Sequence, residues 1–336
     1  MKVLSLFDGM ACGMIAMQLA GVEIESYDAY EIDKYAIKAA QHNFPMIKEP
    51  GDVFGADFTQ YEGVDFLMGG SPCTYWSIAQ TKNRETVASG MGWELFSQYV
   101  RALHEAKPKY FIYENNKSMS NAIRESITET FGFEPICINS ALVSAQNRQR
   151  LYWVGKRNED GTYSKVPVEQ PEDRGILLRD ILESGIAWHE KSYCITATEY
   201  KGSNPQQTLT KHRRTMVAEP VEPRCVAQCG RYPENPKLRV AGLPTEQMFE
   251  AREDGKTHQV YEVRNGLITI KGKQYPIKLK DGYYIIRKLT VRECMRLQTV
   301  PEWYEFPVSD SQAYKMLGNG WTCEVIAHIL KYLKEA

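Results

Sequence analysis

The chain has 336 residues, of which 43% are hydrophobic and 25% are charged, and its formal net charge at pH 7 is −1. This length and composition exclude a small disulfide-stapled scaffold and a disordered chain, and they suit one large or two modest globular domains. No apolar run reaches the roughly 18 residues that a membrane span requires. The segment Met1–Phe7 leads into a strand-like run without a basic region or a cleavage site, so we expect a cytoplasmic protein.

Eight cysteines are spread along the chain without a Cys-x-x-Cys pair or a histidine at metal-ligand spacing. Cys225 and Cys229 form the only close pair in the sequence, and we interpret their spacing as incidental because no second ligand pair accompanies it. We therefore expect neither a disulfide framework nor a metal site. Most of the thiols are expected to pack as small buried hydrophobes.

Short apolar runs alternate with helical patterns through the first part of the chain. The first run, Val3–Phe7, leads through Asp8 and Gly9 into an apolar-periodic stretch. The next runs are Glu25–Tyr30, Val64–Met68 and Tyr110–Tyr113. Strands that alternate with helices predict an α/β fold with a doubly wound, mostly parallel sheet covered on both faces. In such sheets, ligands bind beyond the carboxyl ends of the strands.

The pattern changes after the apolar run Leu151–Gly155. From about residue 156 to 286 the segments are short and rich in Pro, Gly, Thr, Lys and Asn, which predicts a smaller, irregular domain. Helical patterning returns at Thr290–Leu297 and at Thr322–Lys334. The expected division is a large domain at 1–160, a smaller domain at 161–286 and a C-terminal segment at 287–336.

The near-zero net charge hides an asymmetry. Residues 191–286 hold 16 lysines and arginines against 10 acidic residues, a net charge of +6 that leaves −7 on the rest of the chain. A polyanion would meet this basic segment, although a solvated lysine-rich surface accounts for the charge equally well. The basic residues singled out are Lys211, His212, Arg213, Arg214, Arg231, Lys237, Arg239, Lys271, Lys273, Lys278 and Lys280.

A glycine turn and two acidic residues have the spacing of a nucleotide-type pocket. Glu31 ends the second strand, about 18 residues after Gly13, where a carboxylate accepts hydrogen bonds from ribose hydroxyls. Asp52 follows in a third turn, where it could accept from an adenine amino group. The turn lacks the full phosphate-binding glycine pattern and a nearby basic residue, so an adenosine ligand without phosphates, such as S-adenosylmethionine, fits best. A plain turn with an acidic loop is the alternative.

Reactive side chains follow two other predicted strands. Cys73 lies on a Gly/Pro loop just after the strand Val64–Met68, and Glu114 comes directly after Tyr110–Tyr113. A nucleophile and an acid at neighbouring strand ends indicate a reaction centre, although a lone cysteine is more often structural. Arg148 and Arg150 enter the next strand, whose alternation places both on one side, and a nearby guanidinium favours a thiolate.

These motifs, in their chain order, resemble those of the DNA (cytosine-5) methyltransferases, and Ser5-Leu6-Phe7-Asp8-Gly9 and Ser71-Pro72-Cys73 look most like the phage and bacterial orphan enzymes and the animal de novo branch. The resemblance covers about residues 3 to 330 and leaves only the middle region unmatched in detail. The matching blocks are Phe7-Asp8-Gly9 through Gly13, Ser71-Pro72-Cys73, Tyr113-Glu114-Asn115, Gln146-x-Arg148-x-Arg150, Arg287 through Gln298 and Leu317-Gly318-Asn319-Gly320. The resemblance implies a class I S-adenosylmethionine methyltransferase fold, a middle target-recognition domain and a last segment that returns to the first helix.

The resemblance also implies the reaction. Carbon 5 of cytosine is a poor nucleophile, and adding the Cys73 thiolate at carbon 6 converts the ring to an enamine that can attack the sulfonium methyl group. Glu114 is expected at ring nitrogen 3 and the amino group, and Arg150 at the ring carbonyl, with Arg148 supporting the loop. The target base has to be flipped out of the duplex.

Binding residues are predicted on the same basis. The predicted cofactor contacts are Phe7, Asp8, Gly9, Gly13, Glu31, Ile32, Asp52, Val53, Pro72, Asn319 and Gly320. The predicted DNA contacts are Ser77, Gln146, Arg213 and Arg214. We expect a monomer that acts on double-stranded DNA, without a metal or a membrane, and the sequence leaves open whether a restriction endonuclease accompanies it in a restriction-modification system.

Three positions depart from the commonest family pattern. Ser71 replaces the first proline of Pro-Pro-Cys, a variant that the family tolerates. Asn116 replaces a valine and could add a polar contact behind Glu114. Trp321 stands where a smaller aliphatic residue is usual, and it either reshapes the methionine end of the cofactor pocket or simply packs a helix.

Three other functions were weighed. A tRNA cytosine methyltransferase shares these motifs, but it usually has Cys-Phe-Thr after the nucleophile loop, where this chain has Tyr75-Trp76-Ser77. A silent DNA-binding homologue typically loses the cysteine, the glutamate or the arginines, and all of them are present here. A nicotinamide dehydrogenase would need a phosphate loop and would leave Cys73 and Glu114 unexplained.

Overall fold

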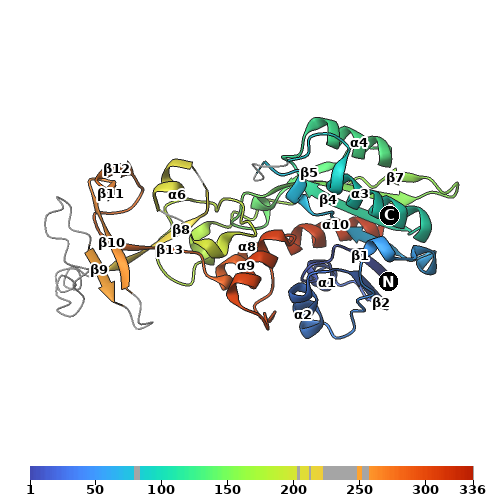
Figure 1. Ribbon diagram of the computed structural model, residues 1–336, viewed down its shortest axis with the longest axis horizontal. Coiled ribbons are helices and arrows are strands. Elements are labelled where there is room, and N and C mark those ends of the chain that lie inside the picture. The colour runs from blue at the N-terminus through green and yellow to red at the C-terminus, as the bar shows by residue number, and fades with distance from the viewer. Residues whose placement is uncertain (79–83, 203–204, 212, 222–247, 252–256, 336) are drawn as a thin grey trace.

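The structure is a computed structural model that describes residues 1–78, 84–202, 205–211, 213–221, 248–251 and 257–335. Its larger part is built on a seven-stranded sheet with the order β2-β1-β3-β4-β6-β5, in which β7 also pairs with β6 (Figure 1). The strands are β1 Lys2–Leu6, β2 Ser26–Tyr30, β3 Phe66–Gly69, β4 Tyr110–Asn116, β5 Ile136–Asn139, β6 Gln149–Arg157 and β7 Tyr163–Lys165.

The strand directions confirm the predicted mostly parallel sheet. β1 is parallel to β2 and β3, and β3 is parallel to β4. β6 is antiparallel to β4, β5 and β7, so it is the strand that runs against the others in this sheet. The carboxyl ends of β1 to β4 therefore meet at one edge.

Helices cover both faces of the sheet, as the doubly wound prediction requires (Figure 1). Alternate side chains of a strand enter different cores: Val3 and Phe66 pack with α1, α2 and α10, whereas Leu4 and Leu67 pack with α3 and α4. The helices of these layers are α1 Cys12–Leu19, α2 Lys34–Asn43, α3 Gly90–Ala106, α4 Asn121–Phe131 and α10 Cys323–Glu335. Short 3-10 helices are η1 Val53–Gly55, η2 Phe58–Tyr61, η3 Cys73–Tyr75, η4 Ser140–Leu142 and η5 Glu199–Lys201.

A second sheet lies at the other end of the elongated molecule (Figure 1). It has six strands, of which five follow the order β12-β11-β10-β13-β8 while β9 pairs with β10, and every pairing is antiparallel. The strands are β8 Met216–Val221, β9 Met248–Ala251, β10 Thr257–Arg264, β11 Leu267–Ile270, β12 Lys273–Pro276 and β13 Gly282–Lys288. The predicted smaller second part therefore contains a regular antiparallel sheet among its described residues, a feature that the sequence interpretation did not anticipate.

Tight turns explain this regular sheet. Asn265-Gly266 joins β10 to β11 and Lys271-Gly272 joins β11 to β12, and all four residues have positive φ values between 49° and 74°. Two successive positive φ values make the turn that matches the twist of a two-residue hairpin. Asn-Gly is the strongest short-range hairpin signal, so the hairpin of β10 and β11 could have been predicted from the sequence.

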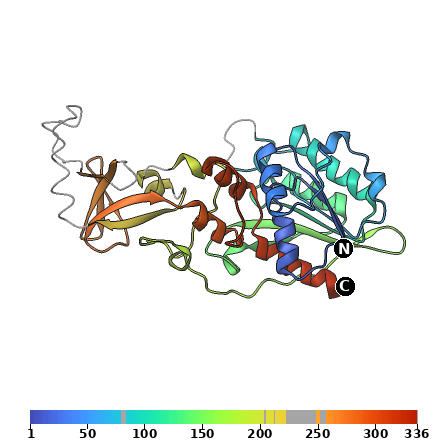
Figure 2. The same ribbon diagram turned by 90° about the horizontal axis from the view of Figure 1, so that it is seen from below.

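The C-terminal segment connects the two parts. α8 Val291–Leu297 and α9 Asp310–Asn319 lie between the sheets, and α10 packs against α1 near both chain termini (Figure 2). The other helices among the described residues are α5 Leu178–Ile181 and α6 Pro205–Lys211. None of the helices in the described ranges has both the length and the apolar character needed to cross a membrane.

The domain boundaries at 160 and 286 stay predictions. β7 pairs with the large sheet beyond residue 160. Val166, Leu178, Ile181 and Ile195 belong to the same buried hydrophobic core as residues of α1 and α10. The middle region therefore begins with an arm on the larger part before the antiparallel sheet starts.

Candidate active site

The loop that carries Cys73 is anchored to the neighbouring strand. Cys73 opens η3 directly after β3, behind an exposed Pro72. The buried Ser71 hydroxyl lies 2.7 Å from the Tyr113 hydroxyl, and Asn115 Nδ2 donates to the Ser71 carbonyl oxygen at 3.1 Å. Tyr113 and Asn115 flank Glu114 on β4, so one strand places both the thiol loop and the carboxylate.

Gly70 brings the loop against Glu114. A Cβ on Gly70 would lie 2.8 Å from both the Glu114 carbonyl oxygen and Glu114 Oε2, a distance that real Cβ atoms do not reach. The Glu114 side chain is 11% exposed, and its Oε1 lies 3.0 Å from Arg150 Nε. The predicted cysteine, glutamate and arginine are therefore on adjoining backbone segments at one edge of the sheet.

A second donor reaches Glu114 from the C-terminal segment. Trp321 Nε1 donates to Glu114 Oε2 at 2.9 Å. Trp321 thus contacts the predicted catalytic carboxylate, a role that neither sequence interpretation of this position included. Asn116, in contrast, turns to its neighbours: its amide donates to Asn115 Oδ1 at 3.0 Å and accepts from the Ser118 hydroxyl at 2.6 Å.

The two arginines reach the same side of β6, as the alternation predicted. Arg148 Nη1 lies 3.3 Å and Arg150 Nη2 lies 3.9 Å from Cys194 Sγ. Arg148 is buried and also donates to the carbonyl oxygens of Gly318 and Gly320, at 3.1 and 2.8 Å. Arg148 therefore holds the Gly318–Gly320 backbone next to the cluster, and Cys194 is a member of the cluster that the sequence interpretation did not include.

The pKa shifts of Cys73 and Cys194 differ from the expectation that the nearby arginines favour a thiolate at Cys73. Burial raises the pKa of the Cys73 thiol, and this outweighs the opposing effect of Arg150, while the Glu114 charge raises the pKa further. At Cys194 the balance is reversed, because Arg148 and Arg150 lower the thiol pKa by more than burial raises it. The arginine pair expected to favour a thiolate at Cys73 favours it at Cys194 in the ligand-free protein.

We accordingly expect Cys194 to be alkylated faster than Cys73 by iodoacetamide at pH 7.5 in the ligand-free protein. Both side chains are partly exposed, and the thiolate is the reactive form, so the lower pKa gives the faster reaction. Peptide mass spectrometry after brief labelling measures the order. In denaturant the difference should disappear, whereas faster labelling of Cys73 in the folded protein would contradict the assignment.

At the carboxyl ends of β1 and β2, Glu31 links two turns. Its Oε2 accepts from the Gly9 backbone N–H at 2.9 Å, and its Oε1 accepts from the backbone N–H groups of Ile32 and Asp33 at 2.8 Å. Phe7 and Gly9 have positive φ values of 58° and 63°, so the first turn is tightly coiled. Ile32 is 75% exposed and presents an apolar surface beside Glu31.

Two carboxylates beside Glu31 lack counter-charges among the residues that the structure describes. Asp8 Oδ1 accepts from Ser5 and Tyr27 at 2.6 Å, but its Oδ2 and both Glu49 oxygens are buried without a hydrogen-bond partner. Burial raises the pKa of Asp8 to about 6. Burial, together with the charges of Asp8 and Glu31, raises the pKa of Glu49 to about 8. These orphaned oxygens suit a positively charged ligand.

The other predicted cofactor residues lie in different settings. Asp52 is exposed and caps η1 through the Phe54 backbone N–H at 3.1 Å, and Val53 is buried beside it. Asn319 is exposed at the end of α9, next to Gly320. At Gly13 a Cβ would lie 2.3 Å from Met68 Sδ, so the absence of a side chain lets α1 pack closely on the sheet, and a cofactor contact at Gly13 stays a prediction.

The predicted DNA residues also separate. Gln146 is fully buried and bonds to the Leu297 carbonyl oxygen, Gln298 and the Ile195 backbone N–H, so its prediction as a DNA contact is wrong. Ser77 is partly exposed just after η3, Arg213 is exposed, and Arg214 donates to Thr198 Oγ1 at 3.0 Å.

The other basic residues singled out from the sequence divide into two sets. Lys211 and the four lysines around β12 are exposed. His212, Arg231, Lys237, Arg239, Cys225 and Cys229 lie outside the described residues.

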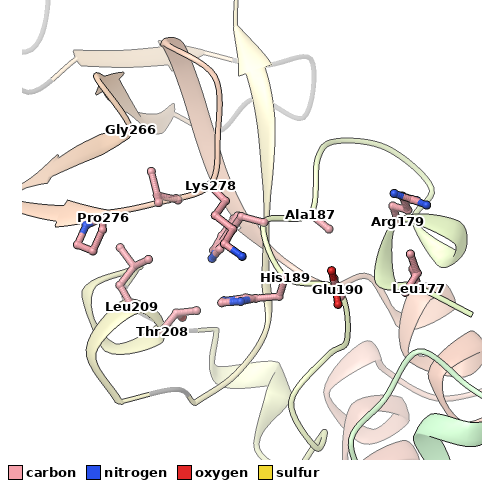
Figure 3. A pocket seen from close by; sticks show the side chains of 12 residues that line it. Leu177, Arg179, Ala187, His189, Glu190, Thr208, Leu209, Gly266, Pro276 and Lys278 are labelled. Carbon is pink, nitrogen blue, oxygen red and sulfur yellow. The ribbon is translucent and has the colours of Figure 1, made fainter. Parts of the chain in front are cut away.

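A cavity of about 710 Å³ lies apart from this cluster. Figure 3 shows it between α6, which contributes Thr208 and Leu209, and the β12–β13 connection, which contributes Lys278. None of the predicted catalytic or cofactor residues lines it. The cavity is also lined by Leu177 and Arg179 beside α5, so it lies where the arm on the larger part meets the second part, separate from the Cys73–Glu114 cluster.

The doubly wound sheet, together with the separate antiparallel sheet, is consistent with a class I methyltransferase fold. A solved DNMT2 mutant from Spodoptera frugiperda has this fold, with a TM-score of 0.60 and 17% identity over 99% of each chain. The chain belongs to the C-5 cytosine-specific DNA methylase family, whose model matches residues 1–335. It is thus a DNA cytosine-5 methyltransferase by family.

Two phage relatives are similar in sequence. The orphan methyltransferase M.SPRI of Bacillus phage SPR is 34% identical in an alignment of 434 residues that covers 99% of this chain and 97% of the relative. The orphan methyltransferase M.Rho11sI of Bacillus phage rho11s is 35% identical over 171 residues, which are 47% of this chain and 33% of the relative. The alignment with M.SPRI therefore runs from one end of this chain to the other.

Proposed function

We propose that this protein transfers a methyl group from S-adenosylmethionine to carbon 5 of a flipped-out cytosine in duplex DNA, through a covalent bond from Cys73 to carbon 6. The observation that carries the proposal is the convergence of Cys73, Glu114 and Arg150 at one sheet edge, with Glu114 and Arg150 paired at 3.0 Å. A thiol, a carboxylate and a guanidinium are the groups that this addition requires.

The chain's own residues divide the chemistry. The Cys73 thiolate adds to carbon 6, and electron density moves toward carbon 5 and toward ring nitrogen 3 of the base. Glu114 holds nitrogen 3 and the amino group, and Arg150 turns from Glu114 to the ring carbonyl, where both offset the developing charge. After methylation the carbon 5 proton leaves and the thiolate is eliminated, which restores the aromatic ring and the free Cys73.

The turns after β1 and β2 would hold S-adenosylmethionine. Glu31 would accept from the ribose, Ile32 and Val53 would lie on the adenine, and Asp52 would accept from its amino group. The cofactor carries a sulfonium and an ammonium charge, which fit the orphaned oxygens of Asp8 and Glu49. When bound, it supplies the electrophilic methyl group.

The antiparallel sheet would supply the DNA contacts. Flipping a base costs a few kcal/mol of stacking and pairing, which binding has to offset. The exposed lysines Lys271, Lys273, Lys278 and Lys280 lie together around β12, where phosphate contacts would position the duplex.

We place the enzyme in the cytoplasm as a monomer, and the proposed chemistry requires no metal because the thiolate is the nucleophile.

The test is nucleoside mass spectrometry on DNA and RNA from a host without cytosine-5 methylation of its own. The host expresses either the intact chain or Cys73→Ala. The proposal expects 5-methylcytosine in DNA with the intact chain only. 5-Methylcytosine in RNA alone would favour the tRNA methyltransferase activity instead. Its absence from both nucleic acids would overturn the proposal.

A further inference from the structure

Trp321 lies where it can control the orientation of Glu114. Its Nε1 donates to Glu114 Oε2 at 2.9 Å, while Arg150 Nε lies 3.0 Å from Oε1, so the two oxygens have different anchors. We propose that Trp321 is a positioning residue that holds the Glu114 carboxylate in the orientation that receives the target base. The proposal rests on the proposed function, because it assigns Trp321 a part in that reaction.

The backbone on both sides of Trp321 is fixed. The Gly320 carbonyl oxygen accepts from Arg148 Nη2 at 2.8 Å and from Gln298 Nε2 at 2.9 Å. On the other side, the buried Thr322 hydroxyl bonds to Gln298 Oε1 at 2.9 Å and to the Ser140 hydroxyl at 2.8 Å. The indole is therefore presented from a rigid segment, which is what a group that orients another side chain requires.

The contacts of Arg150 and Trp321 with Glu114 behave differently during the proposed reaction. Arg150 has to leave Oε1 when it turns to the ring carbonyl, and Oε1 then becomes free for the base. The Trp321 bond to Oε2 can persist, because Trp321 belongs to a segment that the base does not need to displace. Without it, the carboxylate would rotate about its side-chain bonds and lose the geometry that favours addition at carbon 6.

A neutral donor suits this task. The indole N–H has a fixed direction and no acceptor, so it orients one carboxylate oxygen without competing for the protons of the base. An aliphatic residue at this position, which is usual in the family that the motifs resemble, cannot make the bond. The donor is thus a property of this chain's own Trp321.

The test compares the intact enzyme with Trp321→Phe, which keeps an aromatic ring but removes the N–H donor together with part of the indole volume. We expect the single-turnover methylation rate at saturating DNA and cofactor to fall by about 10- to 100-fold, the loss of one hydrogen bond to a charged group. Dissociation constants for S-adenosylmethionine, by calorimetry, and for DNA should stay unchanged. Trp303→Phe, at an exposed tryptophan, is the matched control and should retain the full rate.

A double-mutant cycle separates positioning from packing. If Trp321 acts through Glu114, then Trp321→Phe should slow a Glu114→Gln enzyme much less than it slows the intact one. Equal losses in both backgrounds, an unchanged rate, or a loss that saturating cofactor restores would each overturn the proposal. An intact chain that methylates no cytosine would instead contradict the proposed function, so the two failures are distinguishable.

Discussion

Replacing Glu114 with glutamine is expected to slow methyl transfer by about 10²- to 10⁴-fold while making Cys73 more reactive toward alkylating agents. The first effect follows because an amide cannot carry the charge or exchange the proton that the base requires at nitrogen 3. The second follows because the Glu114 charge raises the pKa of Cys73, and removing it enlarges the thiolate fraction at pH 7.5. Single-turnover methylation and timed iodoacetamide labelling measure the two effects.

A slower methyl transfer combined with faster alkylation of Cys73 distinguishes a catalytic carboxylate from a structural one. A merely unfolded site would expose Cys73 and abolish activity together, so a thermal melt has to show that the variant stays folded. Glu62→Gln, which removes an exposed carboxylate paired with Lys107, is the control and should change neither measurement. Slower or unchanged labelling of Cys73 in Glu114→Gln would contradict the electrostatic assignment.

The site could be predicted as far as strand ends determine it. Cys73 and Glu114 each follow a short apolar run, and parallel strands bring their carboxyl ends to one edge, so local pattern was sufficient. Arg148 and Arg150 likewise follow from the period of two along β6. These residues are close in space because the regular geometry of the sheet requires it.

The rest depends on contacts between distant segments, which no local spacing encodes. Trp321 meets Glu114 across 207 residues, and Cys194 meets Arg148 across 46 residues. Gln146 was predicted to contact DNA from the family resemblance of its motif, but backbone groups of other segments satisfy it in the interior. A buried polar residue with complete hydrogen bonding cannot be distinguished from a surface one by its type alone.

The antiparallel sheet is a different case, because its signals were present and local. Leu267 to Ile270 alternates partly buried and fully buried side chains, and Asn265-Gly266 and Lys271-Gly272 bound it on both sides. A high content of Gly, Pro and Lys suggested irregular structure, whereas here it reflects short strands joined by tight turns. Turn chemistry is therefore the better guide in this region.

Replacing Glu293 with alanine is expected to lower the free energy of unfolding by about 3–5 kcal/mol, the cost of breaking a buried ion pair by removing one partner. Glu293 is fully buried, and its two oxygens each lie 2.8 Å from an Arg287 Nη atom. Arg287 Nε also contacts Glu219 Oε1 at 2.7 Å, so the pair joins β8 and β13 of the second sheet to α8. Calorimetry should show a melting temperature about 6–12 °C lower.

Glu302→Ala is the matched control, because Glu302 pairs with Arg292 and Arg296 of the same helix but is 52% exposed. An exposed pair contributes about 1 kcal/mol or less, so this variant should melt within a few degrees of the intact chain. Equal shifts in both variants would contradict the importance of burial. Because Arg287 also fixes the direction in which the antiparallel sheet leaves α8, Glu293→Ala should weaken DNA binding under the proposed function, even at temperatures where the chain stays folded.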